Sequence, residues 1–84
     1  MPITGDCFDV GIDIYGADID SVPSIQTPYE CQAECQKLQA CQYWTFITSS
    51  KRCYRKSYKP CPINHYNHPN AVSGPKFCRK GKII

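Results

Sequence analysis

TPYECQAECQKLQACQYWTFITSSKRCYR, which spans Thr27–Arg55, is the stretch that decides the fold of this chain. It contains four of the seven cysteines, the strongest helix signal and the clearest hairpin signal. Thr27 followed three residues later by Glu30 is a capping box, and Pro28 occupies the first helical position, where its missing N–H costs nothing. The pattern predicts a helix from Pro28 to about Gln39.

The apolar face of this helix consists largely of sulfur. Cys31, Cys35 and Leu38 follow one another at helical spacing, whereas the remaining positions are mostly polar. A stripe this small buries little area by itself. We therefore expect disulfides to fasten the helix to the rest of the domain.

A β-hairpin is predicted directly after the helix. Residues 41–47, CQYWTFI, are rich in aromatic and β-branched types, residues 48–50 are turn-forming, and residues 51–58 form the returning strand. Trp44 and Phe46 share one face of the first strand, and we place them in the core.

Spacing limits how the helix and hairpin can be joined. Cys35 and Cys41 are six residues apart across the helix end, so a short bridge is accessible. Cys31 lies roughly 6 Å further back along the axis, an offset that could bring it over the second hairpin strand and Cys53. Near the two ends of the chain, Cys7 and Cys78 could close the domain by pairing.

These residues resemble the apple (PAN) domain family. The resemblance rests on four features of the sequence. They are the spacing Cys31-x3-Cys35-x5-Cys41, the YWTF run at 43–46, the CYRK run at 53–56, and AVSGPK at 71–76 ahead of Cys78. The resemblance extends from Cys7 to Cys78. The Ser-Gly-Pro-Lys form is most similar to apple domains of microneme adhesins from apicomplexan parasites.

The resemblance implies an α+β fold in which one disulfide-stapled helix is cradled by a curved antiparallel β-sheet. It implies the pairs Cys7–Cys78, Cys31–Cys53 and Cys35–Cys41. Cys61 departs from the family pattern because it has no partner in this three-bridge core. We expect a single domain over residues 1–84, with a core at 7–78 and a tail or linker at 79–84.

Size and composition point to a secreted scaffold. Eighty-four residues give one small core, and seven cysteines in so short a chain are typical of disulfide-rich extracellular domains. We find no signal peptide and no apolar run long enough to span a membrane. The expectation is a module of a longer secreted protein, one of several repeats.

Charge is divided along the chain. All seven acidic residues lie at or before Glu34, and all ten basic residues lie at or after Lys37, although the net charge is only +3. Either the two halves pair across the fold, or a basic half remains available to an anionic partner.

The flanking segments are predicted more coarsely. Alternation predicts a strand over Phe8–Tyr15, a loop over Ala17–Gln26, and a short strand around Val72 that returns toward the first strand. The aspartates at the start could suggest calcium, but their spacing matches no EF-hand loop. We favour the interpretation that these aspartates lie on the solvent-exposed face of a strand.

The segment Pro60–Pro69 is predicted to be a proline-stiffened loop. Cys61, His65 and His68 could suggest zinc by residue type, but three ligands without a Cys-x-x-Cys pair do not make the usual site. We predict no metal and no cofactor. In an oxidising compartment Cys61 is either a free thiol or a link to another chain or domain.

The candidate ligand-binding residues are Arg52, Tyr54, Arg55 and Lys56 on the second hairpin strand. If Cys53 faces the helix, alternation turns Arg52, Tyr54 and Lys56 outward. Basic groups beside an exposed tyrosine could hold an anionic glycan or a carboxylate. The alternative is an ordinary charged strand face that keeps the sheet soluble.

The predicted function is a non-catalytic extracellular adhesion module, stored in a secretory organelle and active at a host or partner surface. Its expected partners are a host or co-secreted protein, an anionic glycan or neighbouring apple repeats, with no nucleic acid and no membrane insertion. The alternative is a structural spacer or assembly repeat joined through Cys61. An enzyme is disfavoured because no nucleophile motif or phosphate-binding loop is present.

Overall fold

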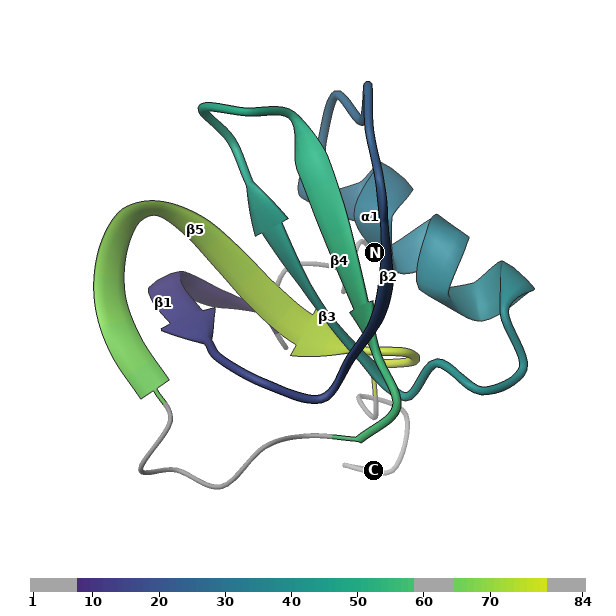
Figure 1. Ribbon diagram of the computed structural model, residues 1–84. Coiled ribbons are helices and arrows are strands. Elements are labelled where there is room, and N and C mark those ends of the chain that lie inside the picture. The colour runs from purple at the N-terminus through teal and green to yellow at the C-terminus, as the bar shows by residue number, and fades with distance from the viewer. Residues whose placement is uncertain (1–7, 59–64, 79–84) are drawn as a thin grey trace, which may run out of the picture.

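One helix packs on a five-stranded antiparallel sheet in the computed structural model, which describes residues 8–58 and 65–78 (Figure 1). The spatial order of the strands is β1-β5-β3-β4-β2. This arrangement is the α+β fold that the sequence predicted. The elements in chain order are β1 Asp9–Ile14, β2 Asp18–Val22, α1 Pro28–Lys37, β3 Tyr43–Ile47, β4 Arg52–Lys56 and β5 His65–Pro75.

Helix α1 begins as predicted. The Thr27 side chain accepts a hydrogen bond from the Glu30 N–H at 3.1 Å, and the Glu30 carboxylate accepts one from the Gln26 N–H at 2.8 Å. The return bond therefore reaches one residue beyond the usual capping box. The helix ends at Lys37, two residues before the predicted Gln39, because the chain turns at an extended Leu38 toward the hairpin.

Two disulfides attach this helix to the hairpin. Cys31 is bonded to Cys53 on β4, and Cys35 is bonded to Cys41 just before β3, each with a Cα–Cα distance of 5.3 Å. These are two of the pairs that the family resemblance implied. Cys78 is also disulfide-bonded. The expected Cys7–Cys78 pair stays a prediction because Cys7, like Cys61, lies outside the described residues.

The hydrophobic core lies between α1 and the sheet. Trp44 and Phe46 are 0% and 1% exposed, which confirms their predicted place. The Trp44 indole meets the Phe8 ring edge-on at 4.9 Å and donates its N–H to the Pro75 carbonyl at 2.8 Å. A Cβ on Gly74 would lie 2.6 Å from the indole, so the strand can approach the ring this closely only at glycine.

The predicted loop over Ala17–Gln26 is wrong for its first half. Residues 18–22 form strand β2, which pairs antiparallel with β4 from Asp18↔Lys56 to Val22↔Cys53. The segment lacks an apolar alternation because it is an edge strand whose exposed side chains are mostly polar. Its partners, instead of apolar neighbours, are basic side chains of β4.

The predicted loop over Pro60–Pro69 is also wrong where the structure describes it. His65 is already in β5, a long strand that curves across the sheet and pairs with both β1 and β3 (Figure 1). Pro69 is tolerated because it falls in a register shift between the pairs Ile12↔Asn67 and Val10↔Val72, where no ladder N–H is needed.

In the described part of the chain, no helix has the length and apolar character needed to cross a membrane.

Candidate functional site

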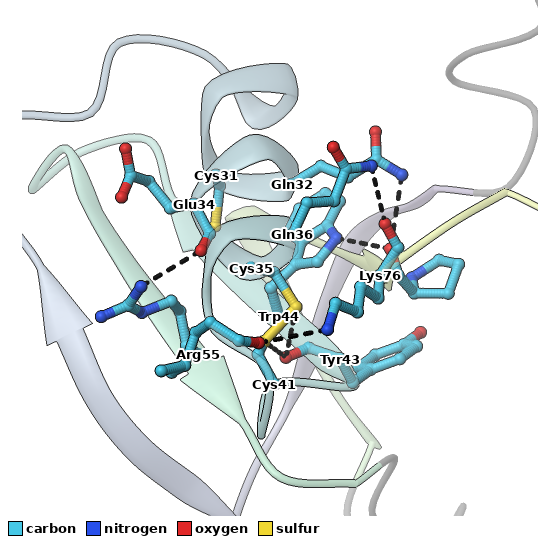
Figure 2. Close-up of a disulfide and its surroundings, with 12 residues drawn as sticks. Cys31, Gln32, Glu34, Cys35, Gln36, Cys41, Tyr43, Trp44, Arg55 and Lys76 are labelled. Atoms are coloured by element: carbon cyan, nitrogen blue, oxygen red, sulfur yellow. Dashed lines mark hydrogen bonds between the residues drawn. A yellow bond between two sulfur atoms is a disulfide. The ribbon is translucent and has the colours of Figure 1, made fainter.

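The four candidate residues on β4 do not form one surface. Arg55 lies on the same face as Cys53, toward the helix, where it donates to the Glu34 carbonyl at 3.1 Å (Figure 2). Tyr54 and Lys56 alternate with these residues and lie on the opposite face of the sheet. The structure thus separates Arg55 from the other members of the predicted basic patch.

Each basic group of this strand has a partner from the acidic or polar half of the chain. The Arg55 guanidinium binds Asp20 with two hydrogen bonds, of 2.8 and 2.6 Å. These hydrogen bonds hold the pKa of the Asp20 carboxyl below its usual value. Arg52 donates to the Ser21 hydroxyl at 2.9 Å. The two halves of the chain therefore pair across β2 and β4, one of the two alternatives left open by the charge pattern.

Lys56 is a buried cation rather than an outward-facing one. It is 2% exposed, and its ammonium group contacts the Asp18 carboxylate and donates to the Gly16 carbonyl at 3.0 Å. The Ser57 N–H donates to the Ala17 carbonyl at 2.9 Å beside it. These contacts hold the turn between β1 and β2, in which Gly16 and Ala17 both have positive φ.

A cavity of about 370 Å³ lies on this second face of the sheet. Every strand contributes to it, together with the β1–β2 turn and the hairpin loop. Its lining combines two tyrosines, two carboxylates, one ammonium, one imidazole, one hydroxyl and one aliphatic side chain. The lining residues are Asp13, Tyr15, Asp18, Ile47, Ser50, Tyr54, Lys56 and His68.

The cavity offers both apolar ring surface and hydrogen-bonding groups. Tyr15 is 67% exposed at its edge, and Tyr54 is partly exposed within it. Lys56 contributes little free positive charge, because Asp18 already neutralises it. The His68 ring accepts a hydrogen bond at Nδ1 from the Asn70 N–H, 3.2 Å away. This combination suits an uncharged ligand that carries many hydroxyl groups.

Only Tyr54 and Lys56 were named as candidate ligand-binding residues from the sequence. The others were missed because the cavity draws on segments up to 55 positions apart, from Asp13 to His68, and because the segments that carry Asp18 and His68 were both predicted to be loops. The available signal was Tyr15, a large aromatic residue placed directly before a strand-breaking glycine. Such a residue points to an exposed ring at a sheet edge.

Within residues 8–58 and 65–78, no group of three or more His, Cys, Asp and Glu side chains is arranged to hold a metal ion.

A family profile described as the PAN domain matches residues 12–63, more than half of the chain. The chain therefore belongs to the PAN domain family, the apple-type family that its cysteine spacing predicted. No curated protein sequence matches it.

Three solved structures are similar to the whole fold. The structure of two N-terminal apple domains of Toxoplasma gondii microneme protein 4 is 22% identical, with a TM-score of 0.73 over 89% of this chain and 45% of that one. TgMIC4-A5, solved in complex with lacto-N-biose, is 26% identical, with a TM-score of 0.72 over 86% and 99%. A PAN module from Eimeria tenella is 21% identical, with a TM-score of 0.64 over 93% and 87%.

This chain therefore spans less than half of the two-domain structure, and about one domain of the other two.

Proposed function

We propose that this PAN domain is a non-catalytic extracellular adhesion module that binds a neutral glycan in the cavity opposite the helix. The observation that carries the proposal is the cavity itself, in which two tyrosine rings lie beside carboxylate, hydroxyl and imidazole groups. Its volume of about 370 Å³ lies in the range of small-molecule sites, which extends from roughly 300 to 1,000 Å³.

Sugars match this lining in two ways. The C–H face of a pyranose ring packs on an aromatic ring, and Tyr15 and Tyr54 supply such rings at the edge and within the cavity. Sugar hydroxyls donate to carboxylates, and Asp13 and Asp18 supply acceptors. The Ser50 hydroxyl adds a group that both donates and accepts.

A neutral glycan is favoured over an anionic one, because the basic groups of β4 are already engaged. Asp20 binds Arg55 on the helix side, and Asp18 binds Lys56 at the cavity. An added sulfate or carboxylate would meet two aspartates instead of an open cation. The complex of the similar TgMIC4-A5 with lacto-N-biose, a disaccharide, supports this choice.

The test is titration calorimetry of the oxidised domain with lacto-N-biose, after a glycan array has been screened at physiological salt. Tyr15→Ala and Tyr54→Ala should each weaken binding roughly tenfold, since each removes an aromatic contact with the sugar. Tyr29→Ala is the matched control, because Tyr29 is 51% exposed but lies on α1, across the sheet from the cavity.

Two results would contradict the proposal. One is equal loss of affinity in the Tyr29 control and in the cavity variants. The other is salt-sensitive binding of heparin with no binding of neutral glycans, which would return the site to the basic groups of the hairpin.

We further propose that the domain is one module of a longer secreted protein. Disulfides at Cys31 and Cys35 require an oxidising compartment, and the similar microneme protein 4 structure contains two apple domains. The alternative role as a spacer joined through Cys61 depends on a residue outside the described ranges. Intact mass after alkylation without reduction would separate a free thiol from an inter-chain bond.

A further inference from the structure

The cavity carries an excess of negative charge. Among the described residues that line it, two carboxylates, those of Asp13 and Asp18, stand against one ammonium group, that of Lys56. The Lys56 ammonium contacts Asp18 and donates to the Gly16 carbonyl at 3.0 Å, so these two charges compensate each other within the wall. Asp13 is therefore the carboxylate that the lining leaves without a counter-charge.

The Asp13 carboxylate is placed where a ligand can reach it. Asp13 is half-buried near the end of β1, and Tyr15, two positions further along the chain, lines the same cavity. Among residues 8–58 and 65–78, none forms an ion pair with Asp13 or donates a hydrogen bond to its side chain. A partly buried charge is screened less by salt than one on the open surface. A cationic group that enters the cavity therefore meets a carboxylate that has no competing partner in the described structure.

The two tyrosine rings of the cavity also favour a cation. The face of an aromatic ring is the negative part of its quadrupole, and it attracts an ammonium group within about 6 Å of the ring centre. Tyr15 is 67% exposed at the edge of the cavity, and Tyr54 is partly exposed within it. The same rings can pack against the C–H face of a sugar. Rings beside an uncompensated carboxylate thus suit a sugar that carries a positive charge.

A free amino group is the substituent that gives a sugar this charge. A primary amine of ordinary basicity is mostly protonated at about pH 7. Its N–H groups donate charge-assisted hydrogen bonds, which are roughly twice as strong as neutral ones. An acetamido group at the same position offers one neutral N–H, so it can donate to Asp13 but cannot compensate its charge.

We propose that Asp13 is a specificity-determining residue, through which the cavity selects sugars with a free amino group over their N-acetylated forms. The Asp13 carboxylate accepts hydrogen bonds from the sugar ammonium, while Tyr15 and Tyr54 contact the sugar ring. Asp18 remains bound to Lys56 and accepts from hydroxyl groups. This inference rests on the proposed function for the sugar scaffold, and it goes further by naming the substituent that the cavity prefers.

The test is calorimetry of the oxidised domain at about pH 7 with two disaccharides that differ only in acetylation. They are the glucosamine disaccharide and N,N′-diacetylchitobiose, and lacto-N-biose is the neutral reference. The wild-type domain should bind the glucosamine disaccharide about fivefold more tightly than the acetylated form, the factor expected when a charge-assisted hydrogen bond replaces a neutral one. This preference should shrink as the salt concentration rises, because ions screen the attraction.

Asp13→Asn should abolish the preference, because the amide keeps the shape of the carboxylate and loses its charge. The ratio of the two affinities is the readout, since the proposed function also assigns sugar hydroxyls to Asp13. Asp20→Asn is the matched control and should keep the preference. It removes the same charge from the chain, but Asp20 binds Arg55 on the helix side of the sheet. An NMR amide spectrum of each variant verifies that it is folded.

The outcomes separate this inference from the proposed function. If lacto-N-biose and the array glycans fail to bind while the glucosamine disaccharide binds with a preference that Asp13→Asn abolishes, the neutral-glycan function is wrong and the role of Asp13 stands. If lacto-N-biose binds but the amine gives no advantage, or if Asp13→Asn keeps the advantage, the role of Asp13 is overturned and the function stands.

Two further results would also overturn the inference. One is the failure of both chitosan-type disaccharides to bind. The other is tighter binding of Nα-acetyl-lysine amide than of the glucosamine disaccharide, which would make the ligand a basic side chain of a protein instead of an amino sugar.

Discussion

The two faces of the sheet in this small domain carry different kinds of side chain. The face under α1 is mainly apolar, with two disulfides packed around Trp44 and Phe46, and Arg55 donates from it to the Glu34 carbonyl of the helix. The opposite face is polar, with a buried hydrogen bond of 2.7 Å between Thr45 and Ser73 and the Lys56–Asp18 ion pair at the cavity. The two disulfides and the two largest fully buried side chains thus lie on one face, whereas polar groups line the cavity on the other.

The sharpest way to break this comparison is to truncate one aromatic residue on each face. Trp44→Ala should lower the free energy of unfolding by about 4 kcal/mol, because it empties a fully buried site. Tyr15→Ala should change it by less than about 0.5 kcal/mol, since the ring is mostly exposed. Denaturant titration measures both, and equal losses would show that the cavity face is part of the core.

A smaller effect comes from the two partners of the ion pair at the cavity. The Lys56 side chain is 3% exposed, whereas that of Asp18 is 45% exposed and can be rehydrated. Asp18→Asn should therefore cost about 3 kcal/mol, because it leaves a buried ammonium group without its counter-charge, and Lys56→Met only about 1 kcal/mol. Denaturant titration of the two variants gives the order, and the reverse order would mean that the carboxylate carries the stability.

The smallest effect concerns the pH dependence of stability at the edge strand. Arg55 lowers the pKa of Asp20 in the folded state, so the pair stabilises the fold above the ordinary carboxyl range. That contribution should fade as the pH falls below about 4, toward the folded-state pKa. Because Asp20 is 41% exposed, the contribution should stay below about 1 kcal/mol.

Asp20→Asn should reduce the loss of stability that occurs as the pH falls into the acid range. Asp13→Asn is the control and should leave the Asp20–Arg55 contribution in place. Thermal unfolding measured from about pH 6 to about pH 2 gives the comparison. If the stability of Asp20→Asn falls as steeply with decreasing pH as that of the wild type, other groups cause the acid sensitivity.

The helix face was predictable because its signals are local. The capping residues of α1, the cysteine spacing and the aromatic alternation at Trp44 and Phe46 all lie within Thr27–Arg55. The disulfides convert that local pattern into tertiary structure, since each joins residues no more than 22 positions apart. Local propensity and global fold agree throughout this segment.

The cavity face was not predictable to the same degree because its contacts are remote. Strand β2 is held to β4 by ion pairs such as Asp20–Arg55, and a polar sequence with distant partners looks like a loop when it is read alone. Lys56 was assigned to the surface because the partner that allows its burial lies 38 positions earlier. Charge segregation between the chain halves was the one sequence signal of this pairing.

The segment Ser73–Lys76, which carried part of the family resemblance, has a physical explanation residue by residue. The Ser73 hydroxyl donates to the Ile12 carbonyl at 2.8 Å, and Gly74 leaves room for the Trp44 indole. The Pro75 carbonyl accepts the indole N–H, and the Lys76 ammonium donates to the Leu38 carbonyl at the helix end at 3.1 Å. Substituting Ser73 or Lys76 would remove a side-chain hydrogen bond, and substituting Gly74 would bring a Cβ against the indole, whereas the carbonyl contact at Pro75 belongs to the backbone.

The strand order limits the sequence in which the domain can fold while it is being synthesised. The first two strands to be synthesised, β1 and β2, lie at the two outer edges of the sheet, and each pairs only with a strand made later. A chain emerging from the ribosome or a translocation pore therefore cannot complete either border until β4 and then β5 arrive. The helix and hairpin in the middle of the sequence are the part that can assemble first, and β1 and β5 pair along one edge last.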